Sequence, residues 1–174
     1  MAVGIVRRID ELGRIVIPKE MRKTMRLQVG DEMEICQSDE GLTLKRYSGF
    51  QSAASCCSAV AKLLAKSTDK DVLLVSATEV VVAEGENKRA YRNQLLTNSF
   101  SNELRKRKEI FLRGDAAKMF ENDICSATYA LARPVVASGD FIGAVILLSA
   151  DEPTDADKTY LDFCTELISA TFSE

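Results

Sequence analysis

Histidine is absent from this sequence of 174 residues. Because histidine is the commonest general base near neutral pH and the commonest ligand of protein-bound zinc, its absence excludes many designs of enzyme and metal site. The chain also lacks a run of about 18 apolar residues, which a membrane-spanning helix needs, and it lacks the apolar core of a secretory signal. We therefore expect a cytoplasmic protein without a membrane partner.

The cysteines are too few and too scattered for a disulfide framework. Their number is odd, none forms a Cys-x-x-Cys pair, and they lie at Cys36, Cys56, Cys57, Cys125 and Cys164. In a reducing compartment this arrangement favours free thiols, and a zinc site made only of thiolates would require clustered cysteines. The neighbours Cys56 and Cys57 fall on a predicted helix, where their side chains diverge. The sequence therefore predicts no metal, no cofactor and no disulfide.

The composition is that of a folded protein, with 46% hydrophobic and 28% charged residues. Such a length suits one ordinary domain together with a small one. A short polar break at residues 48–52 separates two halves of different charge. We expect a small domain over residues 1–47, a linker over residues 48–53 and a larger domain over residues 54–174.

Two segments rich in valine and isoleucine, residues 3–9 and 14–17, bracket a turn that contains Gly13. Runs of β-branched residues around such a turn predict a β-hairpin, in which glycine permits the left-handed conformation. Pro18 suits the first turn of a helix, because its missing N–H would be unpaired there in any case. This helix is expected to end near Met25.

A second hairpin is predicted from the apolar segments 33–36 and 42–46, which flank a polar turn at residues 38–41. Hairpin, helix and hairpin together make a module of about 45 residues, close to the size below which a chain rarely buries enough core alone. Its strand edges also need covering. We expect two copies to pair, since pairing would satisfy the edges and the core together.

Positive charge is concentrated near the amino terminus. From Arg7 to Arg26 seven basic residues stand against three acidic ones, whereas the whole chain has a net charge of −3. From Leu27 to Tyr47 the balance is reversed, with two basic and five acidic residues. An isolated run of charge is commonly solvated surface. The asymmetry, together with the hairpin and helix pattern, favours a surface that attracts phosphate.

The predicted partner is double-stranded DNA. The DNA-binding candidates are Arg7, Arg8, Arg14, Arg22 and Lys23. If Arg8 is left out, the other four residues of two chains give about eight cationic groups. Neutralisation of DNA phosphates by these groups could supply most of the non-specific affinity for DNA, and that affinity would depend strongly on salt. The planar fork of arginine can bridge two acceptors on guanine or phosphate, whereas Lys23 is a point charge. Strand alternation places Arg7 and Arg8 on opposite faces, so Arg8 is the weaker candidate.

The second half has the pattern of an α+β domain. A helix over residues 53–66 is predicted to bury Cys56, Val60, Leu63 and Leu64. The polar stretch from Tyr91 to Arg107 is compatible with helix. Apolar segments predict strands at residues 71–77, 80–85, 108–114, 128–138 and 141–150.

The end of the chain carries the clearest local signals. Gly139 and Asp140 are predicted to form a two-residue turn between the last two strands. Thr154 can cap the closing helix, near whose start the acidic Asp155 and Asp157 are favoured by the helix dipole. The apolar face of this helix is predicted to comprise Leu161, Cys164, Leu167, Ile168, Thr171 and Phe172.

The sequence offers no recognisable catalytic set. A nucleophile with a base, paired carboxylates, a phosphate loop and a metal cluster are all missing, so we expect no enzyme and assign no catalytic residues. A small molecule could bind between the sheet and the segment 85–127. The residues that could contribute are Tyr91, Arg92, Arg105, Arg107, Phe120 and Tyr129.

The segment GIVRRIDELGRIVIPKEMRKTMRLQVGDEMEI, which begins at Gly4, resembles the AbrB-type family of bacterial transition-state regulators. The resemblance covers residues 4–47 and implies a swapped-hairpin barrel, all-β-rich and formed by dimerisation. In that family arginines of the barrel contact DNA, and the matching positions here are Arg7, Arg14, Arg22 and Lys23. Lys23 departs from the arginine common there, which puts bidentate contact at that position in doubt.

The carboxyl half, with GDFIGAVILLS and a terminal helix, resembles the GAF-like domain of sporulation regulators that carry this module. That resemblance implies a nucleoid-associated, sequence-selective transcription regulator, activating and repressing forespore genes. It also implies a homotetramer assembled through the GAF-like domains, with an unknown small-molecule effector as a further partner.

Two alternatives stay open. Related barrels neutralise toxins, so the chain could be an antitoxin-like module, although a folded carboxyl half is unlike an extended toxin-wrapping tail. It could also be a thiol-dependent GAF enzyme, such as a sulfoxide reductase, using Cys125 or Cys164. That enzyme would leave the DNA motif unexplained.

Overall fold

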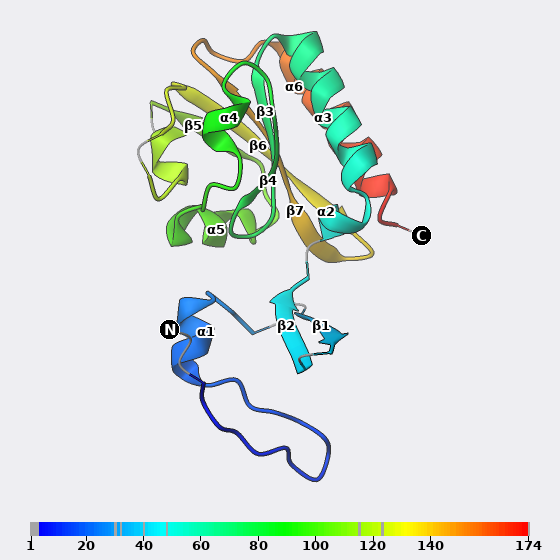
Figure 1. The fold of residues 1–174 in the computed structure, drawn as a ribbon. Coiled ribbons are helices and arrows are strands. Elements are labelled where there is room, and N and C mark those ends of the chain that lie inside the picture. Colours follow the sequence, from blue (N-terminus) through cyan, green and yellow to red (C-terminus); the bar gives the residue numbers. More distant parts are fainter. Residues whose placement is uncertain are drawn as a thin grey trace. The chain divides into compact units, whose positions relative to one another are not determined.

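The computed structural model of the protein (Figure 1) describes residues 4–29, 31, 33–39, 41–47, 49–114, 116–122 and 124–173. The chain divides into two compact units, Met1–Tyr47 and Ser48–Glu174. The elements of the first unit are α1 (Lys19–Thr24), β1 (Met33–Ser38) and β2 (Gly41–Arg46). Those of the second are α2 (Gly49–Ser52), α3 (Ala54–Thr68), β3 (Asp71–Val75), β4 (Val80–Glu84), α4 (Lys88–Tyr91), α5 (Asn98–Leu104), β5 (Ile110–Arg113), the 3-10 turn η1 (Ala116–Met119), β6 (Tyr129–Ala137), β7 (Asp140–Ser149) and α6 (Asp155–Ala170).

Two of the three elements predicted for the amino-terminal unit are confirmed. The strands β1 and β2 pair antiparallel, with Met33 opposite Arg46 and Ser38 opposite Gly41. The helix α1 follows Pro18, which occupies the N-cap position. Proline is tolerated at this end because the first N–H groups of a helix have no partner within it.

The first predicted hairpin forms only at its turn. The N–H of Gly13, at a φ of 76°, donates to the carbonyl of Asp10 at 2.9 Å. Among the described residues, the limbs 4–9 and 15–18 form no strand, and Figure 1 shows them as an open loop. Their β-branched side chains are exposed, Val6 by 93% and Val16 by 73%. An isolated two-stranded ribbon is only marginally stable, and residues 4–9 are all exposed, whereas β1 and β2 are partly buried.

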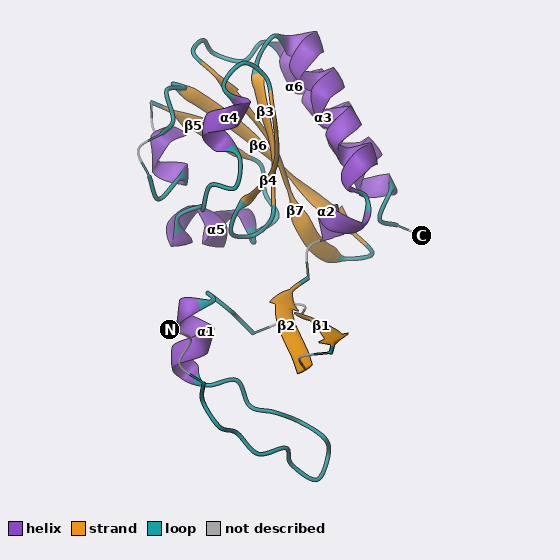
Figure 2. Cartoon of the chain, in the orientation of Figure 1, coloured by secondary structure: helices purple, strands orange, loops and turns teal. Residues whose placement is uncertain are grey.

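The second unit is built on a five-stranded antiparallel sheet of order β4-β3-β7-β6-β5. The helices α3 and α6 cover one face, and α4, α5 and η1 lie on the other (Figure 2). Strand alternation divides β3 between the two cores, because Val72 and Leu74 face α3 and α6 whereas Leu73 and Val75 face the opposite layer. The predicted α+β domain is confirmed.

The turn between β6 and β7 lies one residue earlier than the sequence predicted. Ser138 and Gly139 form it with φ values of 50° and 87°, and Asp140 pairs with Ala137. Positive φ at both central residues is the geometry that continues the twist of a hairpin. Asp140 is therefore the first residue of β7.

The helices bury only part of the faces predicted for them, because Val60 and Leu64 of α3 and Leu161 and Ile168 of α6 are buried as expected whereas other predicted positions are not. On α3 the side chains of Cys56 and Leu63 are exposed, and on α6 Leu167 is 44% exposed. The buried positions of α3 are Cys57, Val60, Ala61, Leu64, Ala65 and Thr68. Those of α6 are Asp157, Leu161, Thr165 and Ile168. Each helix carries apolar residues on more than one stripe, and the sheet covers only one of them.

The segment expected to be a linker contributes to the core of the second unit. Residues 49–52 form α2, and Phe50 is completely buried. Its ring meets that of Phe172 edge-on, with centroids 5.8 Å apart. A Cβ on Gly143 would lie 2.3 Å from the Phe50 ring, so glycine is needed there for close packing. No helix in the described part of the chain is long and apolar enough to cross a membrane.

Candidate nucleic-acid interface

All five predicted DNA-contacting residues belong to the amino-terminal unit and are exposed. Arg7 and Arg8 lie in the first limb, and Arg14 follows the turn. Arg22 and Lys23 share the last turn of α1. Among the described residues, Arg14 alone of the five has an ion pair, so the others are available to a polyanion.

Asp10 organises the turn that carries Arg14. Its Oδ1 accepts the backbone N–H groups of Leu12 and Arg14 at 3.0 and 2.8 Å, and its Oδ2 accepts Nε–H of Arg14 at 2.8 Å. The backbone and then the side chain of Arg14 hold the pKa of Asp10 below its usual range. The sequence places Asp10 at the start of the predicted turn, where an aspartate commonly binds the backbone two residues on.

Arg46 attaches the end of α1 to the second hairpin. Its guanidinium donates to the carbonyls of Met25 and Arg26 at 3.1 and 2.7 Å. It also pairs with Asp31 at 3.2 Å, and the Asp31 side chain is only 5% exposed. These contacts satisfy carbonyls beyond the last turn of α1, on which Arg22 and Lys23 lie. No local spacing signals this role, since Arg46 is 20 residues from its nearest carbonyl partner.

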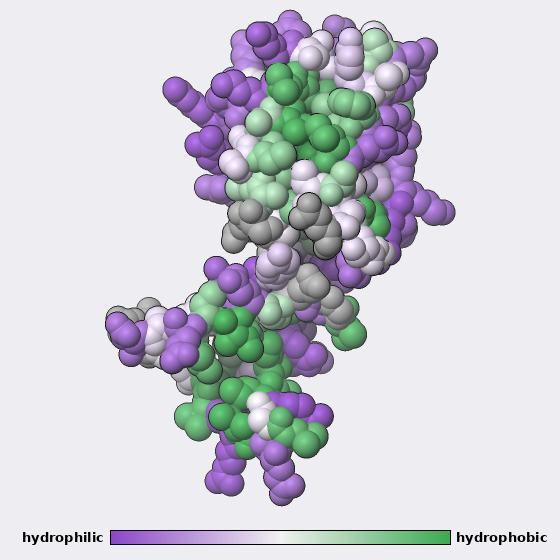
Figure 3. Space-filling view, turned by 90° about the vertical axis from the view of Figure 1, so that its right-hand side faces the viewer, coloured by the Kyte–Doolittle hydropathy of each residue, from purple (hydrophilic) through white to green (hydrophobic). Residues whose placement is uncertain are grey.

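Apolar side chains of the same unit are exposed to an unusual extent. The second hairpin exposes Ile35 by 67% and Leu42 by 70%. The apolar side chains of the limbs and their turn are exposed as well, namely Ile5, Val6, Ile9, Leu12, Ile15 and Val16. The lower part of Figure 3 shows apolar surface gathered on this unit. An isolated small domain does not normally leave so much apolar surface in water.

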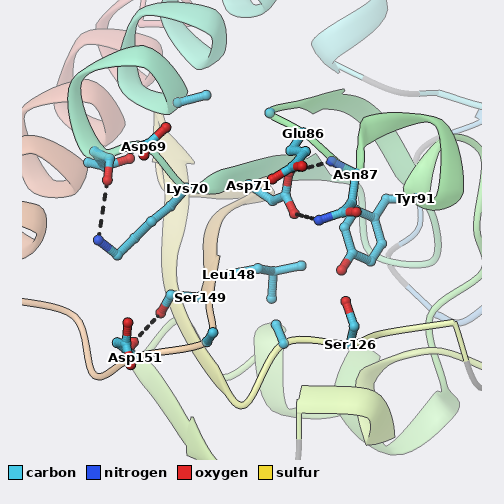
Figure 4. A pocket seen from close by; sticks show the side chains of 15 residues that line it. Asp69, Lys70, Asp71, Glu86, Asn87, Tyr91, Ser126, Leu148, Ser149 and Asp151 are labelled. Carbon is cyan, nitrogen blue, oxygen red and sulfur yellow. Dashed lines mark hydrogen bonds between the residues drawn. The ribbon is translucent and has the colours of Figure 1, made fainter.

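The second unit contains a polar pocket of about 450 Å³ at one end of its sheet (Figure 4). Asp71, which is 8% exposed, accepts the backbone N–H and the Nδ2 group of Asn87 at 2.9 and 2.8 Å. Lys70 pairs with Asp157 at 3.1 Å. Burial, with the neighbouring Cys125, raises the pKa of Tyr91 in the pocket wall to about 12. Asp71 and Lys70 are already bound to Asn87 and Asp157, and these groups assign no particular ligand to the pocket.

Of the six residues expected to contribute to ligand binding, only Tyr91 lines this pocket. Phe120 stacks on Tyr91 in the core, with ring centroids 5.7 Å apart. Tyr129 stacks instead on Phe111. The face of the sheet beneath residues 85–127 is filled by a hydrophobic cluster, which occupies the expected cavity.

Burial makes two of the five thiols poor nucleophiles. All five cysteines are free. Burial and then the neighbouring Cys56 raise the pKa of Cys57 to about 11, and burial raises that of Cys164. Thiols with raised pKa values are poor nucleophiles at neutral pH. Within the described ranges, no three Cys, Asp or Glu side chains are grouped so as to hold a metal ion.

Comparison with known families matches both units. The model of the "Stage V sporulation protein T C-terminal, transcription factor" family matches residues 55–169. The chain is also 35% identical over 157 residues to stage V sporulation protein T of Bacillus subtilis (strain 168), which covers 87% of this chain and 86% of that protein. The chain belongs to the stage V sporulation protein T family. In this member of the family, residues 6–52 match the model "Antidote-toxin recognition MazE, bacterial antitoxin".

The amino-terminal module of this family member is similar to another regulator. It is 50% identical over 46 residues to the transition state regulatory protein AbrB of Bacillus subtilis (strain 168), covering 26% of this chain and 48% of that protein. The unit is therefore AbrB-like.

Solved structures show the fold of the second unit. The cofactor-binding GAF domain of the nutrient sensor CodY from Clostridium difficile is 15% identical, with a TM-score of 0.52 over 66% of this chain and 82% of that one. The type II free methionine-R-sulfoxide reductase from Thermoplasma acidophilum is 16% identical, with a TM-score of 0.54 over 71% and 96%. At such identities the likeness shows a GAF-like fold and carries no activity with it.

Proposed function

We propose that this protein is a sequence-selective DNA-binding transcription regulator of sporulation genes. The observation that carries the proposal is the set of five exposed basic side chains on an AbrB-like unit. The relationship of the chain to a family of sporulation transcription factors supports the same function. The same protein would activate some genes and repress others, because the sign of regulation depends on where the operator lies relative to the promoter. It would act in the cytoplasm of the forespore, bound to the nucleoid.

The DNA-binding form is a dimer in which two chains exchange hairpins. The unpaired limbs, with Val6 93% exposed, need strand partners that one chain does not supply. A second copy would pair the limbs and cover Ile35 and Leu42. The resulting barrel would bring the basic residues of both chains to one duplex.

Two such dimers join through the GAF-like units. The outer face of α3 and α6 exposes Leu63 by 64%, Phe163 by 66% and Leu167 by 44%. Figure 3 views this side and shows apolar side chains over the two helices. Helical faces of this kind bury their apolar stripes by packing against another pair of helices. A small-molecule effector stays a prediction, for which the pocket beside Tyr91 offers room.

Binding to duplex DNA across a salt series tests the proposal. Arg14→Ala is expected to give a shallower slope of log affinity against log salt, by about one for each phosphate that the arginine neutralises. Arg89→Ala, an equal change of charge at an exposed residue of the GAF-like unit, is the matched control and should leave the slope unchanged. Absence of binding by the wild type at low salt would overturn the proposal.

An antitoxin-like role is the second candidate, because the model matching residues 6–52 is that of an antitoxin. The carboxyl half argues against it, since residues 48–174 form a folded unit with its own two-sided core. A thiol-dependent enzyme has less support, because burial raises the pKa of the Cys164 thiol, one of its two candidate nucleophiles. Methionine sulfoxide turnover that Cys125→Ser abolishes would restore that alternative.

A further inference from the structure

We propose that Asp10 is a positioning residue that presents the guanidinium of Arg14 to DNA. The inference rests on the proposed DNA-binding function, and it assigns a role in DNA binding to an acidic residue. A carboxylate beside a DNA-binding surface repels phosphate, so by charge alone it would weaken binding. The hydrogen bonds that Asp10 accepts from the turn and from Arg14 indicate instead that it strengthens DNA binding.

The contacts of Asp10 link the turn to the arginine side chain. Oδ1 accepts the backbone N–H of Leu12 and of Arg14, at 3.0 and 2.8 Å, which closes the turn around Gly13. Oδ2 accepts Nε–H of Arg14 at 2.8 Å. One carboxylate therefore holds both the backbone on which Arg14 stands and the near side of its guanidinium.

This arrangement leaves one end of the guanidinium for a ligand. With Nε bound to Asp10, the two terminal amino groups have no partner among the described residues, and the Arg14 side chain is 70% exposed. Those two groups form a fork that matches paired acceptors on guanine or phosphate. Holding the side chain before DNA arrives reduces the conformational entropy lost on binding.

Glu11 provides the comparison within the same turn. It is exposed, lies next to Asp10 and accepts no hydrogen bond from a described residue. Removing its charge should relieve repulsion of phosphate and change nothing else. Neutralising Asp10 is therefore expected to weaken DNA binding, whereas neutralising Glu11 is expected to leave it unchanged or strengthen it.

The test measures the affinity of the 174-residue protein for two duplexes, one selected by the wild type from a random library and one of random sequence. Asp10→Asn keeps an oxygen that can accept the turn N–H groups but loses the ion pair with Arg14. We expect it to weaken binding of the selected duplex about tenfold, since a dimer would lose the preorganisation of two arginines. Glu11→Gln should leave that affinity unchanged or raise it.

Combination with Arg14→Ala separates positioning from folding. If Asp10 acts through Arg14, Asp10→Asn causes no further loss of affinity for the selected duplex once Arg14 is alanine. An equal loss in both backgrounds, or tighter binding by Asp10→Asn alone, overturns the inference while DNA binding itself stands. Failure of the wild type to bind either duplex removes the proposed function and the inference with it.

A measurement on the wild type keeps the inference testable if a variant does not fold. In the free protein labelled with nitrogen-15, the Nε–H proton of Arg14 should exchange with water more slowly than that of Arg7, which has no ion pair among the described residues. Equal exchange rates would show that Asp10 does not hold Arg14 and would overturn the inference.

Discussion

At the scale of single residues, adjacent positions in the chain have opposite environments. Cys56 is exposed on α3, whereas Cys57 faces the core and is completely buried. One step along a helix turns a side chain by about 100°, so neighbours seldom share a face. Asp10 and Glu11 differ in a similar way, because only Asp10 is bound into its turn.

The two cysteines should react at very different rates. In the folded protein near pH 8, we expect an alkylating reagent to label Cys56 well before Cys57. Burial and the neighbouring Cys56 raise the pKa of Cys57 to about 11, so little thiolate is present. Mass spectrometry after timed labelling checks the order, with urea-unfolded protein as the control in which both react alike. Equal rates in the folded state would contradict the buried position of Cys57.

At the scale of elements, the closing helix is anchored by its first turn. Oδ2 of Asp157 accepts the backbone N–H of Thr154 at 2.7 Å, and the Thr154 hydroxyl accepts the N–H of Asp157 at 3.2 Å. This capping box confirms the predicted cap at Thr154. Asp157 also pairs with Lys70, which follows α3, so one carboxylate joins the two helices that cover the sheet.

Replacing this carboxylate should destabilise the GAF-like unit in a pH-dependent way. Burial favours a higher pKa for Asp157, but the bonds from Thr154 and the charge of Lys70 outweigh it and hold the pKa below its usual value. A lowered folded-state pKa gives stability that is present above the unfolded-state pKa and lost as pH falls through the folded-state value. We expect Asp157→Asn to lower the free energy of unfolding by about 1–2 kcal/mol at pH 7, and by less under acid conditions.

Urea unfolding at pH 7 and at about pH 3 measures this difference. Asp155→Asn is the matched control, because the Asp155 side chain is 98% exposed and its one ion pair with a described residue is with Lys158 of the same helix. Exposed pairs of this kind contribute little to stability. A loss at Asp157 that stays constant across this pH range would refute the linkage.

At the scale of the whole molecule, assembly is expected to depend on apolar faces that a single chain leaves exposed. Leu167→Glu places a charge on the outer face of α6 and should convert the proposed tetramer to dimers. Leu95→Glu is its matched control, since Leu95 is 42% exposed, close to the 44% of Leu167, but lies between α4 and α5. Light scattering coupled to size exclusion gives both masses. If the Leu167→Glu variant were still a tetramer, the interface between dimers would not include the outer face of α6.

Much of the backbone follows from local signals in the sequence. The pairing of β1 with β2, the capped start of α6 at Thr154 and the paired strands β6 and β7 were all predicted, because turn residues and strand alternation act over a few positions. The basic segment was also evident from composition, although its contacts with DNA stay a prediction. Asp10 could have been recognised from its place at the start of a turn.

Only the tertiary structure decided which of several apolar stripes is buried. Leu63 and Leu167 have the spacing of core residues yet are exposed, whereas Phe50, within a polar stretch, is completely buried. The reach of Arg46 to Met25 and the unpaired state of the amino-terminal limbs were equally hidden. Local sequence specifies backbone preference through short-range sterics and hydrogen bonds, whereas burial depends on partners that are distant in the chain or, for the limbs, on a second copy.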